Sequence, residues 1–220
     1  LVSDWSSDVC SSDLFDFGHH TQNRTVYGSI LETVPLPDGL LLVHNTLVGA
    51  NLREKIHLGA AGKITSAFNI ARTLAVGADW CNAARGYMFA LGCIQSLSCH
   101  SDKCPSGVAT QDPSRSARLD VADKSERVYH FHRNTVLALS HMLEAAGLKH
   151  PSELGPEHVI RRVSRYEVRP YSELFEFLEP GVLLDGRAEL HLFKKYWAQA
   201  RADSFAPPDY MLRLRETKLR

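Results

Sequence analysis

Residues 55–111 read KIHLGAAGKITSAFNIARTLAVGADWCNAARGYMFALGCIQSLSCHSDKCPSGVATQ, and this segment gives the clearest indication of the architecture. Two short, mostly apolar runs at residues 55–58 and 78–84 are typical of buried strands. Helical apolar spacing follows each run, at residues 66–76 and 86–94. Strands that alternate with helices in this way form βα units with parallel strands. The sequence therefore predicts an α/β fold that contains a parallel strand pair.

Three cysteines follow the second predicted unit in the spacing C-x5-C-x4-C: Cys93, Cys99 and Cys104. Thiolates select zinc, copper(I) or iron–sulfur clusters. Structural zinc sites prefer C-x2-C pairs and four ligands, and disulfides pair cysteines evenly in oxidising compartments, so an iron–sulfur cluster is favoured over both. Three ligands indicate a 3Fe–4S cluster with one corner vacant. A zinc site and unligated thiols are the alternatives.

Cys81 is the candidate for a fourth cluster ligand. It lies inside the predicted strand at residues 78–84, where a buried and unligated thiol is the commoner role. We therefore interpret Cys81 as a core residue first and as a ligand second.

Small and basic residues stand where each predicted strand ends. Gly62 and Lys63 follow the first strand, and Ala84, Arg85 and Gly86 follow the second. Glycine lets a backbone approach a phosphate, N–H groups at a helix start bind it, and arginine adds charge-assisted hydrogen bonds. In (β/α)8 barrels the loops after the last two strands commonly build such a site. The two loops are compatible with a phosphate site, but glycine-rich strand ends are often ordinary tight turns, and the loops by themselves do not decide between the two.

Helical patterns flank this segment on both sides. One is predicted before it at residues 39–54, and the longest lies after it at residues 123–146, with Asp123 as N-cap, Glu126 in the capping-box position and Gly147 as the stop. The predicted buried stripe of the long helix has helical spacing and consists of Val128, Phe131, Thr135, Ala138, Leu139, Met142 and Leu143. Further helices are predicted at residues 157–163, 171–178 and 190–202.

The composition excludes several classes of function. The 220 residues have zero formal net charge, which argues against nucleic-acid binding by bulk electrostatics. There is no apolar run long enough to span a bilayer and no visible secretory signal, so we expect no membrane association and a cytoplasmic location. Residues 4–14 (DWSSDVCSSDL) match the in-frame translation of a common sequencing-library adapter. Residues 1–14 are therefore interpreted as foreign to the natural chain, with a genuine polar leader as the alternative.

Residues 55–111 strongly resemble the FMN-binding domain of the glutamate synthase family. The cluster motif of the family is met by Cys93-Ile94, by Cys99-His100 and by CPSGVATQ at residues 104–111. The resemblance implies a (β/α)8 TIM barrel, of which residues 35–115 are the C-terminal units with the iron–sulfur loop. Residues 116–220 are then a helical C-terminal extension and tail, and residues 15–34 stay unassigned.

The resemblance also implies the cofactors, which are FMN and a 3Fe–4S cluster on the three cysteines. Gly62 and Lys63 fall in the FMN phosphate loop after strand seven, and Ala84, Arg85 and Gly86 fall in the loop after strand eight. The family often has Gly-Gly and Gly-Thr at these places. We therefore expect the backbone contacts to the phosphate to survive and the side-chain contacts to differ.

The implied activity is that of an oxidoreductase acting on CH–NH2 donors. It forms L-glutamate reductively from 2-oxoglutarate through 2-iminoglutarate, with ammonia derived from glutamine and electrons that pass between the cluster and FMN. A reductase subunit or ferredoxin would supply the electrons. The catalytic residues are expected upstream of Phe15, so we expect this chain alone to be inactive. The alternatives are another FMN-barrel oxidoreductase and a non-catalytic iron–sulfur electron-transfer module.

Overall fold

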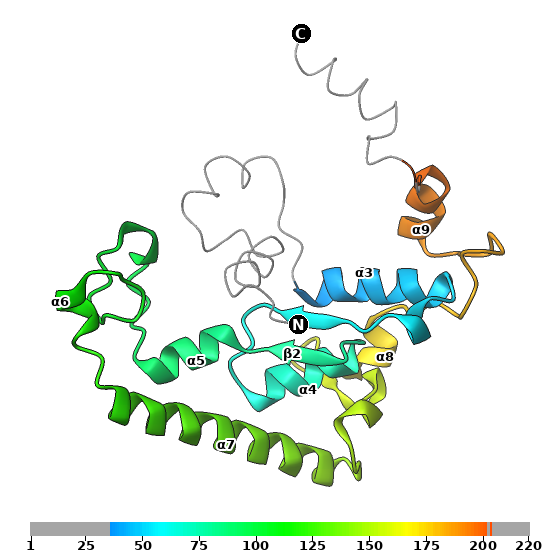
Figure 1. Cartoon of the computed structure of the whole chain (residues 1–220). Coiled ribbons are helices and arrows are strands. Elements are labelled where there is room, and N and C mark those ends of the chain that lie inside the picture. The colour runs from blue at the N-terminus through cyan, green and yellow to red at the C-terminus, as the bar shows by residue number, and fades with distance from the viewer. Residues whose placement is uncertain (1–35, 202, 204–220) are drawn as a thin grey trace.

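The computed structural model describes residues 36–201 and 203, so the predictions for residues 1–14 and 15–34 lie outside it. Helices and two pairs of short strands make up this part of the chain (Figure 1). The labelled elements are α3 (Leu36–Gly49), β1 (Gly59–Ala61), α4 (Ala67–Ala75), β2 (Trp80–Asn82), α5 (Ala84–Leu91), α6 (Pro113–Ser116), α7 (Val121–Ala145), β3 (Ile160–Arg162), β4 (Val168–Pro170), α8 (Tyr171–Leu174) and α9 (His191–Tyr196). Short 3-10 helices lie at Arg53–Lys55, Cys99–Ser101, Pro151–Glu153, Pro156–His158 and Trp197–Gln199.

Strands β1 and β2 pair in parallel, which confirms the predicted parallel pair. The register aligns Gly59 with Trp80. The strand predicted at residues 55–58 is wrong, because a 3-10 helix occupies Arg53–Lys55 and pairing begins only at Gly59. A Cβ atom at Gly59 would lie 2.5 Å from the Trp80 ring. The missing side chain at Gly59 is therefore what lets the indole lie against the neighbouring strand.

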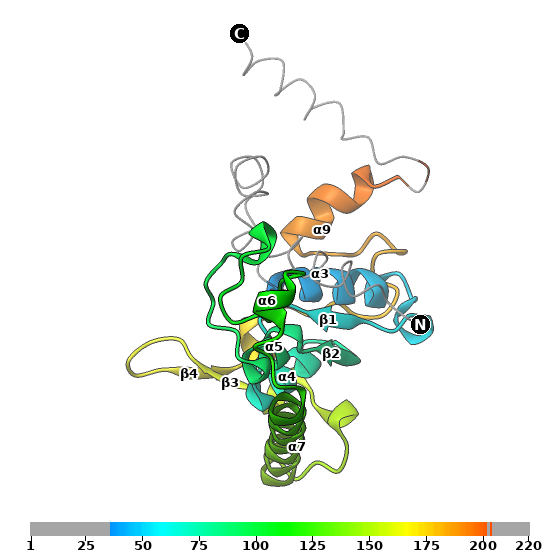
Figure 2. The same ribbon diagram turned by 60° about the vertical axis from the view of Figure 1, so that its left-hand side comes forward.

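Helices α3 and α4 lie on opposite sides of this strand pair (Figures 1 and 2). Helix α4 begins close to the predicted residue, because the Ser66 hydroxyl accepts a hydrogen bond from the Asn69 N–H at 3.3 Å and caps the helix. The main core combines these layers with two residues from beyond α7 and consists of Leu40, Ala60, Ala75, Val76, Ala78, Val159 and Tyr171. The described residues thus form a mixed α/β structure with short strands, and they do not close a barrel. No helix among them has the length and apolar character needed to cross a membrane.

The long helix α7 packs against α4 and α5 along the lower side of the view in Figure 1. The predicted stripe is confirmed, because all of its members are buried or half-buried. The predicted N-cap is wrong: Asp120 caps the helix by accepting hydrogen bonds from the N–H groups of Ala122 and Asp123. Gly147, with φ of +75°, follows the C-cap as predicted.

The segment after α7 contains strands where a helix was predicted. Residues 157–163 form the end of a 3-10 helix and then β3, which pairs antiparallel with β4. The β-branched pair Val159 and Ile160 favours extended backbone over helix. The Tyr171 N–H donates to the Val159 carbonyl at 2.8 Å and closes the base of this hairpin. The described part of the helical extension predicted at residues 116–220 is therefore only partly helical.

Asn45 of α3 fixes the segment that follows α8. The helix predicted at residues 171–178 ends at Leu174, and the next residues are bonded to the Asn45 amide instead. Asn45 Nδ2 donates to the Glu176 carbonyl at 2.8 Å, and the Leu178 N–H donates to Asn45 Oδ1 at 3.0 Å. Because Asn45 is 3% exposed, one buried side chain satisfies two backbone groups and joins parts of the chain that are distant in sequence.

Candidate cofactor site

The cysteine loop begins where α5 ends. Gly92 has φ of +103°, which favours glycine, and its N–H donates to the Phe89 carbonyl at 3.0 Å. The chain therefore turns away from the helix at Cys93, which is half-buried. Cys99 is exposed in a 3-10 helix, and Cys104 is buried.

Cys104 has polar groups of its own loop close to its sulfur atom. The Ser106 hydroxyl lies 3.4 Å from Cys104 Sγ, and the backbone N–H groups of Ser106, Val108 and Ala109 also point to the sulfur. The Ser106 hydroxyl is the main cause that lowers the pKa of the Cys104 thiol to about 7, with the backbone donors adding to it and burial opposing it. Because donors favour the charged form, Cys104 is readily held as a thiolate near neutral pH.

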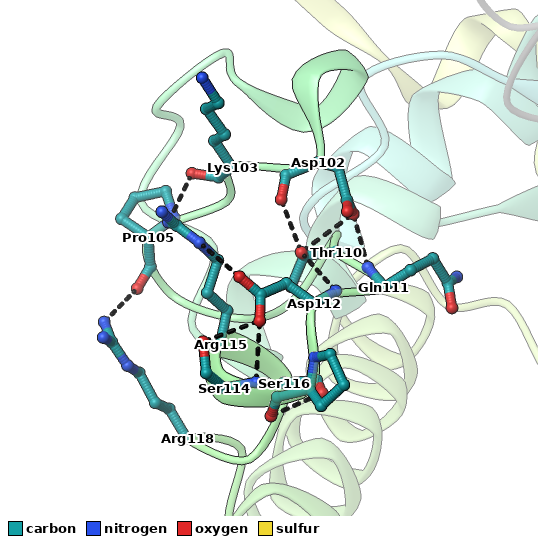
Figure 3. Close-up of polar contacts among 11 residues, drawn as sticks. Asp102, Lys103, Pro105, Thr110, Gln111, Asp112, Ser114, Arg115, Ser116 and Arg118 are labelled. Atoms are coloured by element: carbon teal, nitrogen blue, oxygen red, sulfur yellow. Dashed lines mark hydrogen bonds and ion pairs between the residues drawn. The ribbon is translucent and has the colours of Figure 1, made fainter.

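Asp102 is hydrogen-bonded to Thr110 and Gln111, at the other end of the segment that contains Cys104 (Figure 3). It adopts the left-handed conformation with φ of +60°, which aspartate tolerates better than most residues. Its Oδ1 accepts the Gln111 N–H at 2.6 Å, and the Thr110 hydroxyl lies 2.7 Å from its carbonyl oxygen and 3.0 Å from Oδ1. These contacts close the loop, so that Cys104 and its donors lie between two fixed ends.

Two arginines hold the carbonyls on either side of Cys104. Arg115 Nη1 donates to the Lys103 carbonyl at 3.1 Å, and Arg118 Nη1 donates to the Pro105 carbonyl at 3.4 Å (Figure 3). Asp112 positions the first of them, because it lies 3.2 Å from Arg115 Nε and also caps α6 through the Ser114 N–H at 2.9 Å. Sequence reasoning missed these residues. The Asp112 cap before Pro113 is the one local signal that was present.

The structure does not gather the three predicted cysteine ligands around one point. Among residues 36–201 and 203, no three His, Cys, Asp or Glu side chains are gathered so that they could hold a metal ion. The thiol donor set and the environment of Cys104 fit a thiolate-bound cluster. Ligation of one cluster by all three cysteines therefore requires Cys93 and Cys99 to approach Cys104. Cys81 has a different environment, since burial raises the pKa of its thiol to about 12, which favours its interpretation as a core residue.

The two predicted phosphate loops lie next to each other. Gly62 (φ +150°) and Lys63 (φ +52°) turn the chain after β1, and α5 starts at Ala84 after β2. A Cβ atom at the buried Gly86 would lie 3.4 Å from Thr65 Cα, so the second loop packs against the first.

Arg85 stands in the first turn of α5. Its side chain is half-buried, and it forms no hydrogen bond or ion pair with another described residue. The start of α5 thus combines N–H groups that have no partner inside the helix with a guanidinium available for an anion.

Comparison with known proteins identifies the family. Residues 29–149 match the conserved region in glutamate synthase. The chain is 39% identical over 157 residues to the glutamate synthase large subunit-like protein YerD of Bacillus subtilis, an alignment that covers 66% of this chain and 30% of that protein. It is 33% identical over 113 residues to the glutamate synthase (NADPH) large chain of B. subtilis, covering 51% of this chain and 7% of that protein.

A plant relative shows the same similarity. The chain is 36% identical over 81 residues to ferredoxin-dependent glutamate synthase 1 of Arabidopsis thaliana, covering 37% of this chain and 5% of that protein. The chain therefore spans less than a third of the length of each of these relatives. Since the matched region includes more than half of its residues, the chain belongs to the glutamate synthase family.

Proposed function

We propose that this chain is part of a cytoplasmic iron–sulfur flavoprotein of glutamate synthase type, with FMN and a 3Fe–4S cluster as cofactors. The observation that carries the proposal is the buried Cys104 thiol, whose sulfur lies 3.4 Å from the Ser106 hydroxyl and whose pKa is lowered to about 7, first by that hydroxyl and then by backbone hydrogen bonds of the loop. Such an environment favours the thiolate, which is the form that binds iron. Cys93 and Cys99 lie in the same loop as free thiols, and we assign them as the other two ligands.

The adjoining strand ends support the FMN part of the proposal. Gly62 and Lys63 would meet the flavin phosphate with backbone N–H groups, as would Ala84 and Gly86 at the start of α5. Arg85 would add a charge-assisted hydrogen bond from its half-buried guanidinium. In this interpretation β1 and β2 are the last two strands of a (β/α)8 barrel, whose other strands are contributed by the rest of the protein.

The bound cofactors would supply electron transfer and hydride delivery, which convert 2-oxoglutarate and glutamine-derived ammonia, through 2-iminoglutarate, to L-glutamate. The role of this chain is to hold both cofactors by their anionic groups and sulfur ligands. Two relatives are named as NADPH-type and ferredoxin-dependent enzymes, so a reductase subunit or ferredoxin is the proposed electron donor. The catalytic side chains are expected upstream of Phe15.

The cluster is tested by anaerobic reconstitution of the chain with ferrous iron and sulfide. We expect bound iron and the paramagnetic signal of an oxidised 3Fe–4S cluster, with both lost in Cys104→Ser. Cys81→Ser is the matched control and should keep them, because its thiol is on β2 and has a raised pKa. Zinc binding without iron, or a signal that survives Cys104→Ser, would contradict the ligand assignment.

The flavin is tested by titrating the chain with FMN and following the quenching of flavin fluorescence. Arg85→Ala should weaken binding about tenfold, the value of one charge-assisted hydrogen bond. Arg133→Ala on the exposed side of α7 is the control with the same loss of charge. A chain that binds the cluster but no FMN would favour the electron-transfer module.

A further inference from the structure

The hairpin formed by β3 and β4 projects from the molecule as a two-stranded arm (Figure 2). All residues from 160 to 169 are exposed. The arm is fixed at its base, where Val159 and Tyr171 belong to the main core and are joined by a backbone hydrogen bond of 2.8 Å. An isolated two-stranded hairpin is marginally stable in water, so the anchored base rather than packing of the strands keeps the arm in place.

The arm carries a concentrated positive charge. Its ten exposed residues include four arginines, at positions 161, 162, 165 and 169, and one acid, Glu167. Arg161 and Arg169 are directly opposite each other in the antiparallel register, which places two like charges side by side. Such a pair destabilises a hairpin. Glu167 offsets part of this charge through its ion pair with Arg169 at 2.5 Å.

Apolar side chains are interleaved with these charges. Ile160 is 64% exposed, Val168 57% and Tyr166 89%. Arg165 lies over the Tyr166 ring, with its guanidinium carbon 5.5 Å from the ring centroid. Tyrosine and arginine are the residues that most often dominate protein–protein interfaces. The arm therefore combines the composition of an interface with an unbalanced charge.

We propose that this arm is a docking surface for a carboxylate-rich surface of another protein. Acidic side chains would relieve the repulsion between Arg161 and Arg169, while the exposed apolar residues would be covered at the same time. A nucleic acid is a poorer fit, because the whole chain has zero net charge, and only +3 without Asp4, Asp8 and Asp13 of residues 1–14, so it lacks the broad positive field that phosphate backbones select. This inference is independent of the proposed cofactors.

The test uses the 220-residue chain and a fluorescently labelled peptide of alternating glutamate and valine. A peptide with glutamine in place of glutamate is the uncharged probe. We expect saturable binding of the acidic peptide that weakens with salt, and little binding of the glutamine peptide. Arg161→Gln combined with Arg169→Gln should weaken binding at least about tenfold. This variant removes a like-charge pair together with the exposed ion pair between Arg169 and Glu167, which contributes little, so it is not expected to destabilise the arm.

The control exchanges two exposed arginines of α7, Arg127→Gln with Arg133→Gln, and removes the same charge elsewhere. Equal weakening by both variants, or no binding of the acidic peptide, would overturn the proposal. A single-stranded DNA oligonucleotide that binds the arm more tightly than the peptide would overturn it in favour of nucleic acid. Sedimentation equilibrium tests whether the arm binds a second copy of this chain instead of another protein. Self-association that depends on Arg161 and Arg169 would also overturn the proposal.

Discussion

The strand-pair core and the cysteine loop are held together by different forces. In the core, small side chains such as Ala60 and Ala75 let the strands and α4 approach closely, and Val76 is 2% exposed. In the loop, Cys104 is 4% exposed, Asp102 accepts a hydrogen bond from the Gln111 N–H, and Arg115 and Arg118 donate to backbone carbonyls beside Cys104. Hydrophobic burial is non-directional and is spread over many contacts, whereas each hydrogen bond of the loop depends on the position of one donor and one acceptor.

The core and the cysteine loop are therefore expected to respond differently to substitution. A change in the core alters packing that the whole fold shares, so it is expected to change the free energy of unfolding. A change in the loop removes a local contact and is expected to alter the loop alone. The loop also exposes Ile94 (66%) and Leu97 (59%), so little burial opposes the movement that would bring Cys93 and Cys99 to Cys104.

The largest effect is expected for Gly77→Ala in the core. Gly77 has φ of +118°, and a Cβ atom there would run into the His44 ring. Backbone strain and overpacking together should lower the free energy of unfolding by about 3 kcal/mol, measured by urea denaturation. Gly147→Ala is the matched control, since it also has positive φ but no atom within 4 Å, and it should cost about 1 kcal/mol. Equal losses would show that the His44 contact is unimportant.

Asn45→Ala is expected to have the second largest effect. It leaves the Glu176 carbonyl and the Leu178 N–H without their partner, and unsatisfied buried groups should cost about 2 kcal/mol of unfolding free energy. The neighbouring Thr46→Ala is the control, because its hydroxyl bond to the Leu42 carbonyl is exposed. It should change stability by less than about 0.5 kcal/mol. If Asn45→Ala lowered the free energy of unfolding no more than Thr46→Ala does, the bonds from Asn45 to the segment after α8 would not contribute to stability.

The sequence predicted those elements whose signals are local. Helix α4 and the buried stripe of α7 follow from apolar spacing, and Gly147 marks the end of α7 by chemistry within one turn. The hairpin was missed because residues 160–162 are rich in arginine and have no apolar period, while their partner strand lies beyond a loop. The N-cap was misplaced because Asp120 and Asp123 are both acceptable caps, and only the backbone shows which one begins the helix.

In the candidate site, too, only residues with a local signal could be proposed from the sequence. The cysteines could be proposed as ligands because their chemistry belongs to the residue type and their spacing to one short segment. Arg115 and Arg118 were not, since they bind backbone carbonyls that reach them only after the chain folds back through α6. Because every residue has a backbone carbonyl, the sequence does not show which carbonyl a side chain will bind, and partners of this kind are found only in the structure.

Within the loop, Asp102→Ala should change local opening while leaving global stability nearly intact. The Gln111 amide loses its acceptor at Oδ1, so its hydrogen exchange should become about tenfold faster, while the free energy of unfolding changes by less than about 0.5 kcal/mol. Asp102→Asn keeps an acceptor oxygen and the tolerance for positive φ, so it should exchange more slowly than the alanine variant. If Asp102→Ala lowered the free energy of unfolding as much as Asn45→Ala does, the loop would not open independently of the core.

Ser106→Ala should have the smallest effect, confined to one sulfur atom. The hydroxyl is the main cause of the lowered Cys104 pKa of about 7, so its removal should move the pH midpoint of alkylation by iodoacetamide upward in the metal-free chain. Because the pKa in the folded chain lies below the ordinary value of 9.0, stability should rise as the pH increases from about 7 to about 9, and the variant should show less of this rise. Ser101→Ala, whose hydroxyl donates to the Ser98 carbonyl at 2.8 Å, is the control. An unchanged midpoint would mean that the backbone N–H groups of Ser106, Val108 and Ala109 hold the thiolate without the hydroxyl.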